Sequence, residues 1–270
     1  MKYKLVCSDL DDTLIGKDAK FGKGLKEAVK RYVEQGGKFC IVTGRMTSGA
    51  LPVCRELGLK GEVITYQGAV VTDIETEKTV FSQTISTQDA VEVGRYCESR
   101  GYYYQTYIGD GFYAERPNKF TSIYARLSCA HFEKTPGKLS DYLWENKVCP
   151  PKLLMMAEPE RVPEILEEMR GKFGDKFLIN TSKPYIIEII PQGISKGKAV
   201  ERLAKSYGIK REEVICIGDS ENDLTMIEYA GLGVVVGTGS EIAKRAADVI
   251  APGMDDDPIT WVLERYCIEQ

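Results

Sequence analysis

Apolar residues in the first 82 positions follow two alternating patterns. Short runs in which nearly every residue is apolar, such as residues 4–9, alternate with stretches such as residues 20–35, where apolar residues recur every three or four positions. A continuous apolar run is typical of a strand buried on both faces, and the second spacing is that of an amphipathic helix. The same rhythm returns from residue 189 onward. Strands alternating with helices predict a parallel sheet with right-handed crossovers.

The limits of each element follow from where its pattern begins and ends. In these two outer parts of the chain, the predicted strands are residues 4–9, 38–44, 62–66, 214–219, 231–237 and 248–251. A hairpin is expected at residues 69–82. The predicted helices are residues 20–35, 47–57, 198–207, 221–229 and 241–247, the last with Ser240 as its N-cap.

The middle of the chain has a different organisation. Here the predicted helices are residues 88–100, a segment near Leu139, and residues 162–173, and the predicted strands are residues 101–115, 152–157, 176–180 and 185–190. Hairpins and separated helices indicate an α+β block inserted between the halves of an α/β core. The predicted domains are therefore core residues 1–82, an inserted domain at 83–188, and core residues 189–270.

Composition narrows the class of protein. The 270 residues are 43% hydrophobic and 28% charged, and the formal net charge of −4 argues against nucleic acid or an anionic membrane as a partner. The N-terminal segment MKYKLVCSD does not have the character of a signal peptide, and no apolar run approaches the roughly 20 residues of a membrane span. We expect a cytoplasmic protein that is a monomer or a small homo-oligomer.

The 8 cysteines do not form C-x-x-C pairs, and several lie inside apolar runs. This arrangement argues against a zinc site and indicates small buried hydrophobic side chains in a reducing compartment. The positions are Cys7, Cys40, Cys54, Cys97, Cys129, Cys149, Cys216 and Cys267.

Polar clusters follow three of the predicted core strands directly. They read SDLDDT at residues 8–13, TGR at residues 43–45 and GDSENDLTM at residues 218–226. Open α/β sheets bind ligands at the carboxyl ends of their strands, so these clusters are expected to meet at one edge. Mg²⁺ prefers one or two carboxylates together with phosphate and water. Asp9 and Asp219, with a backbone carbonyl from the Asp11 region, could supply such a shell.

The remaining polar groups suit a phosphoryl ligand. Thr43, the backbone amides around Gly44 and a lysine could hold phosphoryl oxygens. The glycine that follows Lys196 is expected to let the chain turn into its helix with the ammonium group projecting.

In this arrangement the chain resembles the haloacid dehalogenase-like (HAD) superfamily of phosphohydrolases. DLDDTL resembles the family's motif I, IVTGR motif II, Lys196 of GISKGKA motif III, and GDSENDLTM motif IV, in the family's order and spacing. The insertion between motifs II and III resembles the C2 (IIB) cap of the Cof-type subgroup. The resemblance implies a Rossmann-like α/β core with a mobile α+β cap, and a small phosphorylated metabolite as substrate.

The resemblance also implies a role for each matching residue. Asp9 would attack phosphorus and become a transient aspartyl phosphate, and Asp11 would serve as acid and then base. Thr43, Gly44 and Lys196 would bind phosphoryl oxygens.

Motif IV would complete the site. Asp9, Asp11 and Asp219 would hold Mg²⁺, Asp223 would support that shell, and Asn222 would bind substrate through a hydrogen bond.

Two positions depart from the family pattern. Asp12 stands where many relatives have glycine, and we interpret it as structural. Gln67 replaces the asparagine that usually precedes Gly-Ala, which leaves the substrate contact at this position open.

Several residues have simpler readings. Arg45 either contacts substrate or is an exposed residue at a helix start, and His131 is read as an ordinary strand or surface residue. The acidic run at residues 255–258 is read as a turn and cap before a helix. Arg116, Arg126 and Lys183 are read as solvated surface charge. The tyrosines read as core residues of the insertion are Tyr102, Tyr103, Tyr104, Tyr107 and Tyr113.

Two other functions remain open at this point. A phosphosugar mutase would use the same aspartyl phosphate but pass the phosphoryl group to a second hydroxyl. A phosphometabolite-binding regulator would bind the ligand without turnover.

Overall fold

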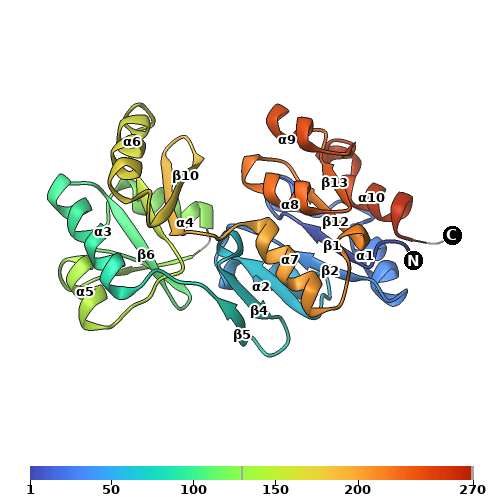
Figure 1. Ribbon diagram of the computed structural model, residues 1–270, viewed down its shortest axis with the longest axis horizontal. Coiled ribbons are helices and arrows are strands. Elements are labelled where there is room, and N and C mark those ends of the chain that lie inside the picture. Colours follow the sequence, from blue (N-terminus) through green and yellow to red (C-terminus); the bar gives the residue numbers. More distant parts are fainter. Residues whose placement is uncertain (129, 269–270) are drawn as a thin grey trace. The chain divides into compact units, whose positions relative to one another are not determined.

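The chain divides into two structural units (Figure 1). The computed structural model describes residues 1–128 and 130–268. The first unit comprises Met1–Arg45, Ala50–Val80 and the chain from Ser195 onward, and the second comprises Met46–Gly49 and Phe81–Ile194. No helix in the described ranges is long and apolar enough to cross a membrane.

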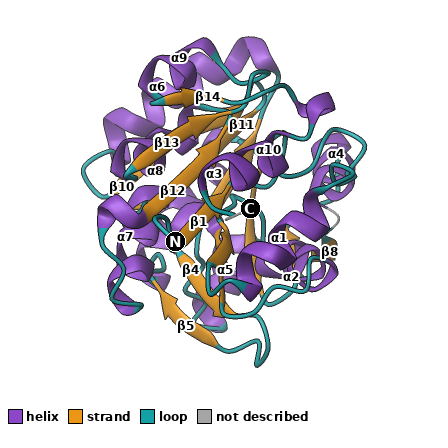
Figure 2. Cartoon of the chain, turned by 90° about the vertical axis from the view of Figure 1, so that its right-hand side faces the viewer, coloured by secondary structure: helices purple, strands orange, loops and turns teal. Residues whose placement is uncertain are grey.

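A five-stranded parallel sheet forms the centre of the first unit. Its order is β14-β13-β12-β1-β2, and Figure 2 shows β13, β12 and β1 side by side. The strands are β1 (Leu5–Ser8), β2 (Lys38–Ile41), β12 (Val214–Gly218), β13 (Leu232–Val235) and β14 (Val249–Ile250). Every residue of β1 and β12 is buried, as expected when both faces of a parallel sheet are covered. The predicted α/β core is thus confirmed.

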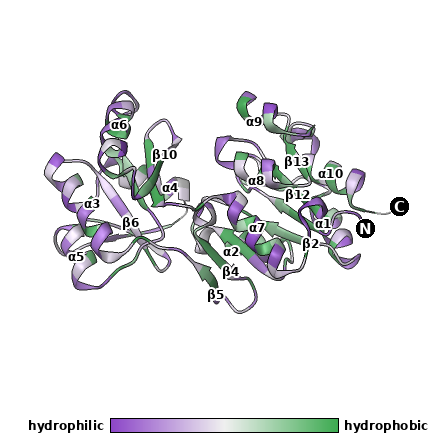
Figure 3. Ribbon diagram, viewed as in Figure 1, coloured by the Kyte–Doolittle hydropathy of each residue, from purple (hydrophilic) through white to green (hydrophobic). Residues whose placement is uncertain are grey.

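Helices cover this sheet. They are α1 (Leu25–Glu34), α2 (Thr47–Glu56), α7 (Lys196–Ser206), α8 (Leu224–Tyr229), α9 (Glu241–Ala246) and α10 (Pro258–Tyr266). Val29 of α1 and Val262 of α10 pack with Val6 and Ile215 of the sheet in one hydrophobic cluster. Figure 3 shows the apolar character of β12 and β13 against the more polar helices. The helix predicted at residues 221–229 begins later than expected, at Leu224 of α8, because Glu221–Asp223 form a 3₁₀ turn.

One predicted strand does not extend the parallel sheet as expected. β3 (Glu62–Thr65) pairs antiparallel with β4 (Val70–Asp73), and β5 (Thr79–Ser82) completes a separate three-stranded sheet. An isolated parallel bridge between Val42 and Ile64 connects it to the end of β2. Short connections on either side of β4 place β3 and β5 next to it, so β4 has a strand on both sides.

The second unit is an α+β fold. Its six-stranded sheet has the order β10-β11-β9-β6-β7-β8, antiparallel except for the β7–β8 pair. The strands are β6 (Tyr104–Ile108), β7 (Gly111–Ala114), β8 (His131–Lys134), β9 (Leu153–Met156), β10 (Phe177–Lys183) and β11 (Ile186–Pro191). Apolar residues of α3 (Thr87–Arg100), α5 (Leu139–Glu145) and α6 (Val162–Phe173) pack with this sheet in one cluster.

The sequence patterns did not predict α4 (Lys119–Ser128) or β8. Tyr124 of α4 lies edge-on against Phe112 of β7, with ring centroids 5.0 Å apart, and its hydroxyl receives a 2.5 Å hydrogen bond from Tyr107. The signal was present in the sequence and was overlooked, because Phe120, Ile123, Tyr124 and Leu127 follow the spacing of an amphipathic helix. These contacts bury Tyr107. Tyr104 is buried in the hydrophobic cluster that α3, α5 and α6 form with the sheet, so the prediction that both tyrosines are core residues is confirmed.

Other readings of single residues have clear outcomes. His131 is an exposed strand residue beside Glu133, as expected. Met254–Asp256 form a turn before α10, which confirms the turn prediction. Asp257 occupies the N-cap position of α10, but its carboxylate makes no capping hydrogen bond there and instead accepts a 2.8 Å hydrogen bond from the Gly24 backbone. Six cysteines are buried and unpaired, whereas Cys149 is exposed, so the buried reading is wrong for that residue. Cys129 lies outside the described residues.

The expected role of Gly197 is also wrong. Gly197 lies inside the first turn of α7 at an ordinary helical position, and Ser195 caps the helix by accepting a hydrogen bond from the Lys198 backbone. A Cβ atom on Gly197 would lie 2.1 Å from the carbonyl oxygen of Thr225 in α8. The glycine therefore permits the close approach of two helices, and it is not needed for a turn.

We expect Gly197→Ala to lower the free energy of unfolding by about 3 kcal/mol, since a backbone carbonyl occupies the space of the new methyl group. Gly171→Ala in α6 is the matched control, because a Cβ there meets no atom within 4 Å. It should stabilise the protein by about 0.5–1 kcal/mol. Urea denaturation of both variants tests the difference. Equal effects of the two substitutions would contradict the close-packing explanation.

Candidate active site

Most of the predicted site residues lie at the carboxyl edge of the parallel sheet. Asp9 directly follows β1, Asp219 directly follows β12, and Thr43 lies just beyond β2. Because β1 pairs with β12 on one side and β2 on the other, the loops after these strands are neighbours. This position is where open α/β sheets hold their ligands.

Lys196 joins two of the aspartates. Its Nζ atom lies 2.5 Å from Oδ1 of Asp9 and 2.6 Å from Oδ1 of Asp223. The Lys196 side chain is fully buried, as is that of Asp223, and Asp9 is 6% exposed. A buried ammonium group between two carboxylates is stable only because each charge has a partner. The fold has therefore placed a charged cluster where water hardly reaches it.

Burial and neighbouring charges shift the pKa values of these groups. Burial raises the pKa of Asp9 well above its ordinary range, Lys196 opposes this rise, and Asp223 and Asp219 add to it. Burial also raises the pKa of Asp219 to about 6, with Asp223 contributing. For Lys196, burial lowers the pKa, but the two adjacent carboxylates outweigh it and keep the ammonium form. Three carboxylates around one lysine leave excess negative charge that a cation would offset.

Asp223 has its oxygens engaged by the protein. Oδ1 accepts from Lys196, and Oδ2 accepts from the backbone amides of Asp219 and Ser220 at 3.0 and 3.1 Å. A Cβ on residue 218 would lie 2.5 Å from the Asp223 Cβ, so this turn requires glycine at Gly218. Asp223 thus holds Lys196 and the Asp219 loop in place.

Sequence reasoning assigned no role to Thr13, although it ends the SDLDDT cluster. Its side chain is buried, and its hydroxyl donates a 2.9 Å hydrogen bond to Oδ1 of Asp219. This contact fixes the orientation of the Asp219 carboxylate. The one available signal was a polar residue next to an apolar run.

The acidic residues fit a hard divalent cation. Asp9, Asp219 and Asp223 each offer a carboxylate oxygen within 4.8 Å of the others. Both carboxylate oxygens of Asp223 already accept hydrogen bonds. Asp9 and Asp219 are therefore better placed as metal ligands, and Asp223 is better placed to support them from outside the metal shell.

The Asp11 carboxylate does not belong to this cluster. Arg45 Nε donates to its Oδ2 at 2.9 Å, and Arg45 Nη2 donates to its Oδ1 at 2.6 Å. The Asp11 side chain is 53% exposed and that of Arg45 is 22% exposed. Arg45 is therefore neither isolated nor simply solvated at the helix start.

The remaining predicted binding residues surround Gln67. A Cβ on Gly44 would lie 2.5 Å from Nε2 of Gln67, and Nδ2 of Asn222 donates to Oε1 of Gln67 at 3.4 Å. Thr43 is buried, and its hydroxyl accepts a 3.0 Å hydrogen bond from the Arg45 backbone. Gln67 thus lies against two loops that carry predicted binding residues.

The backbone presents Gln67 in an unusual conformation. Tyr66 and Gln67 both have left-handed φ angles, of 51° and 60°. A bulky residue such as tyrosine rarely adopts this region, and such strain concentrates at functional sites. Asp12 also has a left-handed φ, of 61°, which aspartate tolerates better than most residues and glycine tolerates freely.

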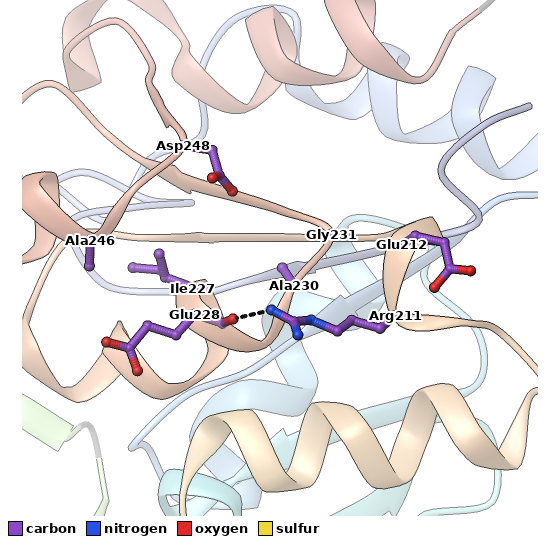
Figure 4. A pocket seen from close by; sticks show the side chains of 8 residues that line it. All are labelled: Arg211, Glu212, Ile227, Glu228, Ala230, Gly231, Ala246 and Asp248. Carbon is purple, nitrogen blue, oxygen red and sulfur yellow. Dashed lines mark hydrogen bonds between the residues drawn. The ribbon is translucent and has the colours of Figure 1, made fainter.

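A surface hollow of about 430 Å³ lies elsewhere on the first unit (Figure 4). Its lining includes Arg211 and Gly231, which precede β12 and β13 and so mark the amino ends of those strands. Arg211 donates a 2.8 Å hydrogen bond to the carbonyl oxygen of Glu228 at the end of α8. This arrangement caps a helix, and it contains none of the predicted site residues.

The geometry suits transfer of a phosphoryl group. A buried carboxylate lies beside a buried ammonium group, and further carboxylates fit a divalent cation at the edge of a parallel sheet.

Comparison with known proteins identifies the family. A haloacid dehalogenase-like hydrolase model matches residues 6–263, so the chain belongs to this superfamily, in its Cof-type branch. A haloacid dehalogenase-like hydrolase from Bacteroides thetaiotaomicron has a structure similar to this one, with a TM-score of 0.89 at 29% identity over 98% of this chain and 99% of that one. The chain is accordingly a phosphatase-type hydrolase acting on phosphate monoesters.

Two further relatives are informative. The 5-amino-6-(5-phospho-D-ribitylamino)uracil phosphatase YwtE of Bacillus subtilis is 25% identical, covering 97% of each chain. The structure of the HAD subclass IIB sugar phosphatase BT4131 has a TM-score of 0.83 at 22% identity, with 98% of this chain and 100% of that one covered, and it supports the fold alone. The Rossmann-like core with an added cap domain is thus a shared architecture.

Proposed function

We propose that this protein is a Mg²⁺-dependent phosphatase that hydrolyses phosphate monoesters of small metabolites through an aspartyl phosphate. The observation that carries the proposal is the buried contact of Lys196 with Asp9, 2.5 Å long, at the carboxyl end of β1. Lys196 neutralises charge beside the reacting carboxylate, so Asp9 can approach an anionic phosphoryl group.

The proposed reaction has two halves. Asp9 forms a bond to phosphorus, the ester bond breaks, and Asp11 gives its proton to the departing alcohol. Asp11 then takes a proton from water, which attacks phosphorus, breaks the acyl phosphate bond and releases inorganic phosphate. Thr43, the Gly44 amide and Lys196 hold the phosphoryl oxygens throughout.

The metal would lie against Asp9 and Asp219, with the backbone carbonyl of Asp11 as a further ligand and Asp223 behind. When bound, Mg²⁺ supplies Lewis acidity that withdraws charge from the phosphoryl oxygens.

We place the cap at residues 83–188 and assign it the alcohol portion of the substrate. The two relatives described above, one a ribitylamino-uracil phosphatase and one a sugar phosphatase, support a sugar phosphate or similar polyol phosphate as substrate. Asn222 would donate a hydrogen bond to that substrate. A cytoplasmic location, as a monomer or small homo-oligomer, agrees with such a metabolic role.

A phosphate-release screen tests the function. Sugar phosphates, nucleotides and cofactor phosphates should be incubated with the protein, with and without Mg²⁺. We expect free phosphate from several sugar phosphates with Mg²⁺ and at least tenfold slower release after chelation. Accumulation of an isomeric sugar phosphate instead would establish the mutase. Phosphate binding without turnover across the panel would establish the regulator.

A further inference from the structure

The pairing of Arg45 with Asp11 has a direct consequence for the proposed acid/base. Both carboxylate oxygens accept hydrogen bonds from one guanidinium group, at 2.9 and 2.6 Å. A carboxylate with both oxygens engaged by a guanidinium group is not free to approach a leaving alcohol. The pair must therefore open during each turnover.

The position of Arg45 suggests what opens it. Arg45 immediately follows Gly44, and its own backbone N–H donates to the Thr43 hydroxyl at 3.0 Å. Its side chain therefore starts beside the proposed phosphate-binding residues. Two oxygens of a phosphoryl group can accept a pair of hydrogen bonds from a guanidinium group, as a carboxylate does, and they carry more negative charge.

We propose that Arg45 is a positioning residue shared between two anions, Asp11 and the phosphoryl oxygens of the substrate. Binding of the substrate draws the guanidinium from Asp11 and releases that carboxyl group to act on the leaving oxygen. This inference rests on the proposed function. It gives Arg45 both a binding role and control over when Asp11 is available.

The exposure of the pair agrees with such an exchange. A half-exposed ion pair is weak, because water and salt screen it, so a competing anion can replace the carboxylate. The buried Lys196 pairs at the same edge are unsuited to exchange, because breaking them would leave buried charges without partners.

A double-mutant cycle on phosphate binding tests the exchange without turnover. Titration calorimetry with inorganic phosphate and Mg²⁺ should use the wild type, Arg45→Gln, Asp11→Asn and the double variant. We expect Arg45→Gln to raise the Kd by about tenfold, as for a lost charged hydrogen bond. Asp11→Asn should lower the Kd by about two- to fivefold in the wild-type background, because Arg45 no longer has a competing partner. In the Arg45→Gln background it should have no effect.

Other outcomes would overturn the proposal. Equal tightening by Asp11→Asn in both backgrounds would show simple repulsion between Asp11 and phosphate, and no tightening in either would show that the anions do not compete for Arg45. Arg45→Lys should bind phosphate with intermediate affinity, since lysine keeps the positive charge but loses the paired N–H donors of the guanidinium group. Arg55→Gln is the matched control, since Arg55 lies in the last turn of α2, the helix that follows Arg45, and pairs with Glu77. A Kd change there equal to that of Arg45→Gln would also overturn the proposal.

The phosphate-release screen separates this inference from the proposed function. Absence of turnover in the wild type, with phosphate still bound, would refute the phosphatase but leave the binding cycle interpretable. Normal turnover, together with additive effects of Arg45→Gln and Asp11→Asn on the Kd for phosphate, would refute the exchange alone.

Discussion

Replacing Asp9 with asparagine is expected to lower kcat for phosphate release by at least about 10⁴-fold while leaving the fold intact. The amide is a poor nucleophile, so the aspartyl phosphate cannot form. Asparagine has nearly the same shape and can still accept the hydrogen bond from Lys196 through its carbonyl oxygen. Phosphate release under saturating substrate measures the loss.

The same variant should keep or slightly gain thermal stability. Burial raises the pKa of Asp9, Lys196 opposes this rise, and Asp223 and Asp219 add to it, so ionisation of Asp9 carries a net cost in the folded protein. A neutral amide removes that cost. Asp18→Asn is the matched control, because Asp18 is exposed in the loop after β1 and should leave kcat unchanged. Near-normal turnover by Asp9→Asn would sink the covalent mechanism.

Replacing Lys196 with methionine is expected to reduce both stability and activity. The side chain is fully buried between Asp9 and Asp223, so its loss leaves carboxylates without a counter-charge. Removing one partner from a buried ion pair costs about 3–5 kcal/mol. Turnover should fall by at least about 10³-fold, because the phosphoryl oxygens lose a charged donor. Chemical denaturation and phosphate release measure the two effects.

Lys152→Met separates the two effects. Lys152 is also buried, and it pairs with Glu188 in the second unit at 2.5 Å. We expect a comparable loss of stability there, with kcat retained within about threefold because Lys152 is not part of the proposed site. Mg²⁺ should raise the Tm of Lys196→Met more than that of the wild type, because a cation can replace the missing charge. If Lys196→Met retained normal turnover, the lysine would have no role in phosphoryl binding.

Local patterns in the sequence were sufficient to place the core strands and the carboxyl edge. A continuous apolar run followed by SDLDDT identifies β1 and the position of Asp9, and VICIGD does the same for β12 and Asp219. This works because buried parallel strands are apolar throughout, so polar clusters mark their ends.

Other features depend on residues far apart along the chain. Thr13 and Asp219 are 206 positions apart, and no local pattern relates them. Arg45 and Asp11 lie 34 positions apart, and sequence reasoning left the partner of Arg45 open. The helix α4 has an amphipathic spacing that the sequence prediction overlooked, whereas its aromatic contacts with β6 and β7 are visible only in the tertiary structure.

By itself, the sequence determined the alternating core, the inserted α+β block and the positions of the charged residues that suit phosphoryl chemistry. Only the tertiary structure decided the partners of each charge: Lys196 lies buried between Asp9 and Asp223, and Asp11 is held by Arg45. It also showed that Gly197 serves the packing of two helices. The physical reason is that strand and helix patterns follow from nearest neighbours, whereas burial and charge pairing follow from which segments the whole chain brings together.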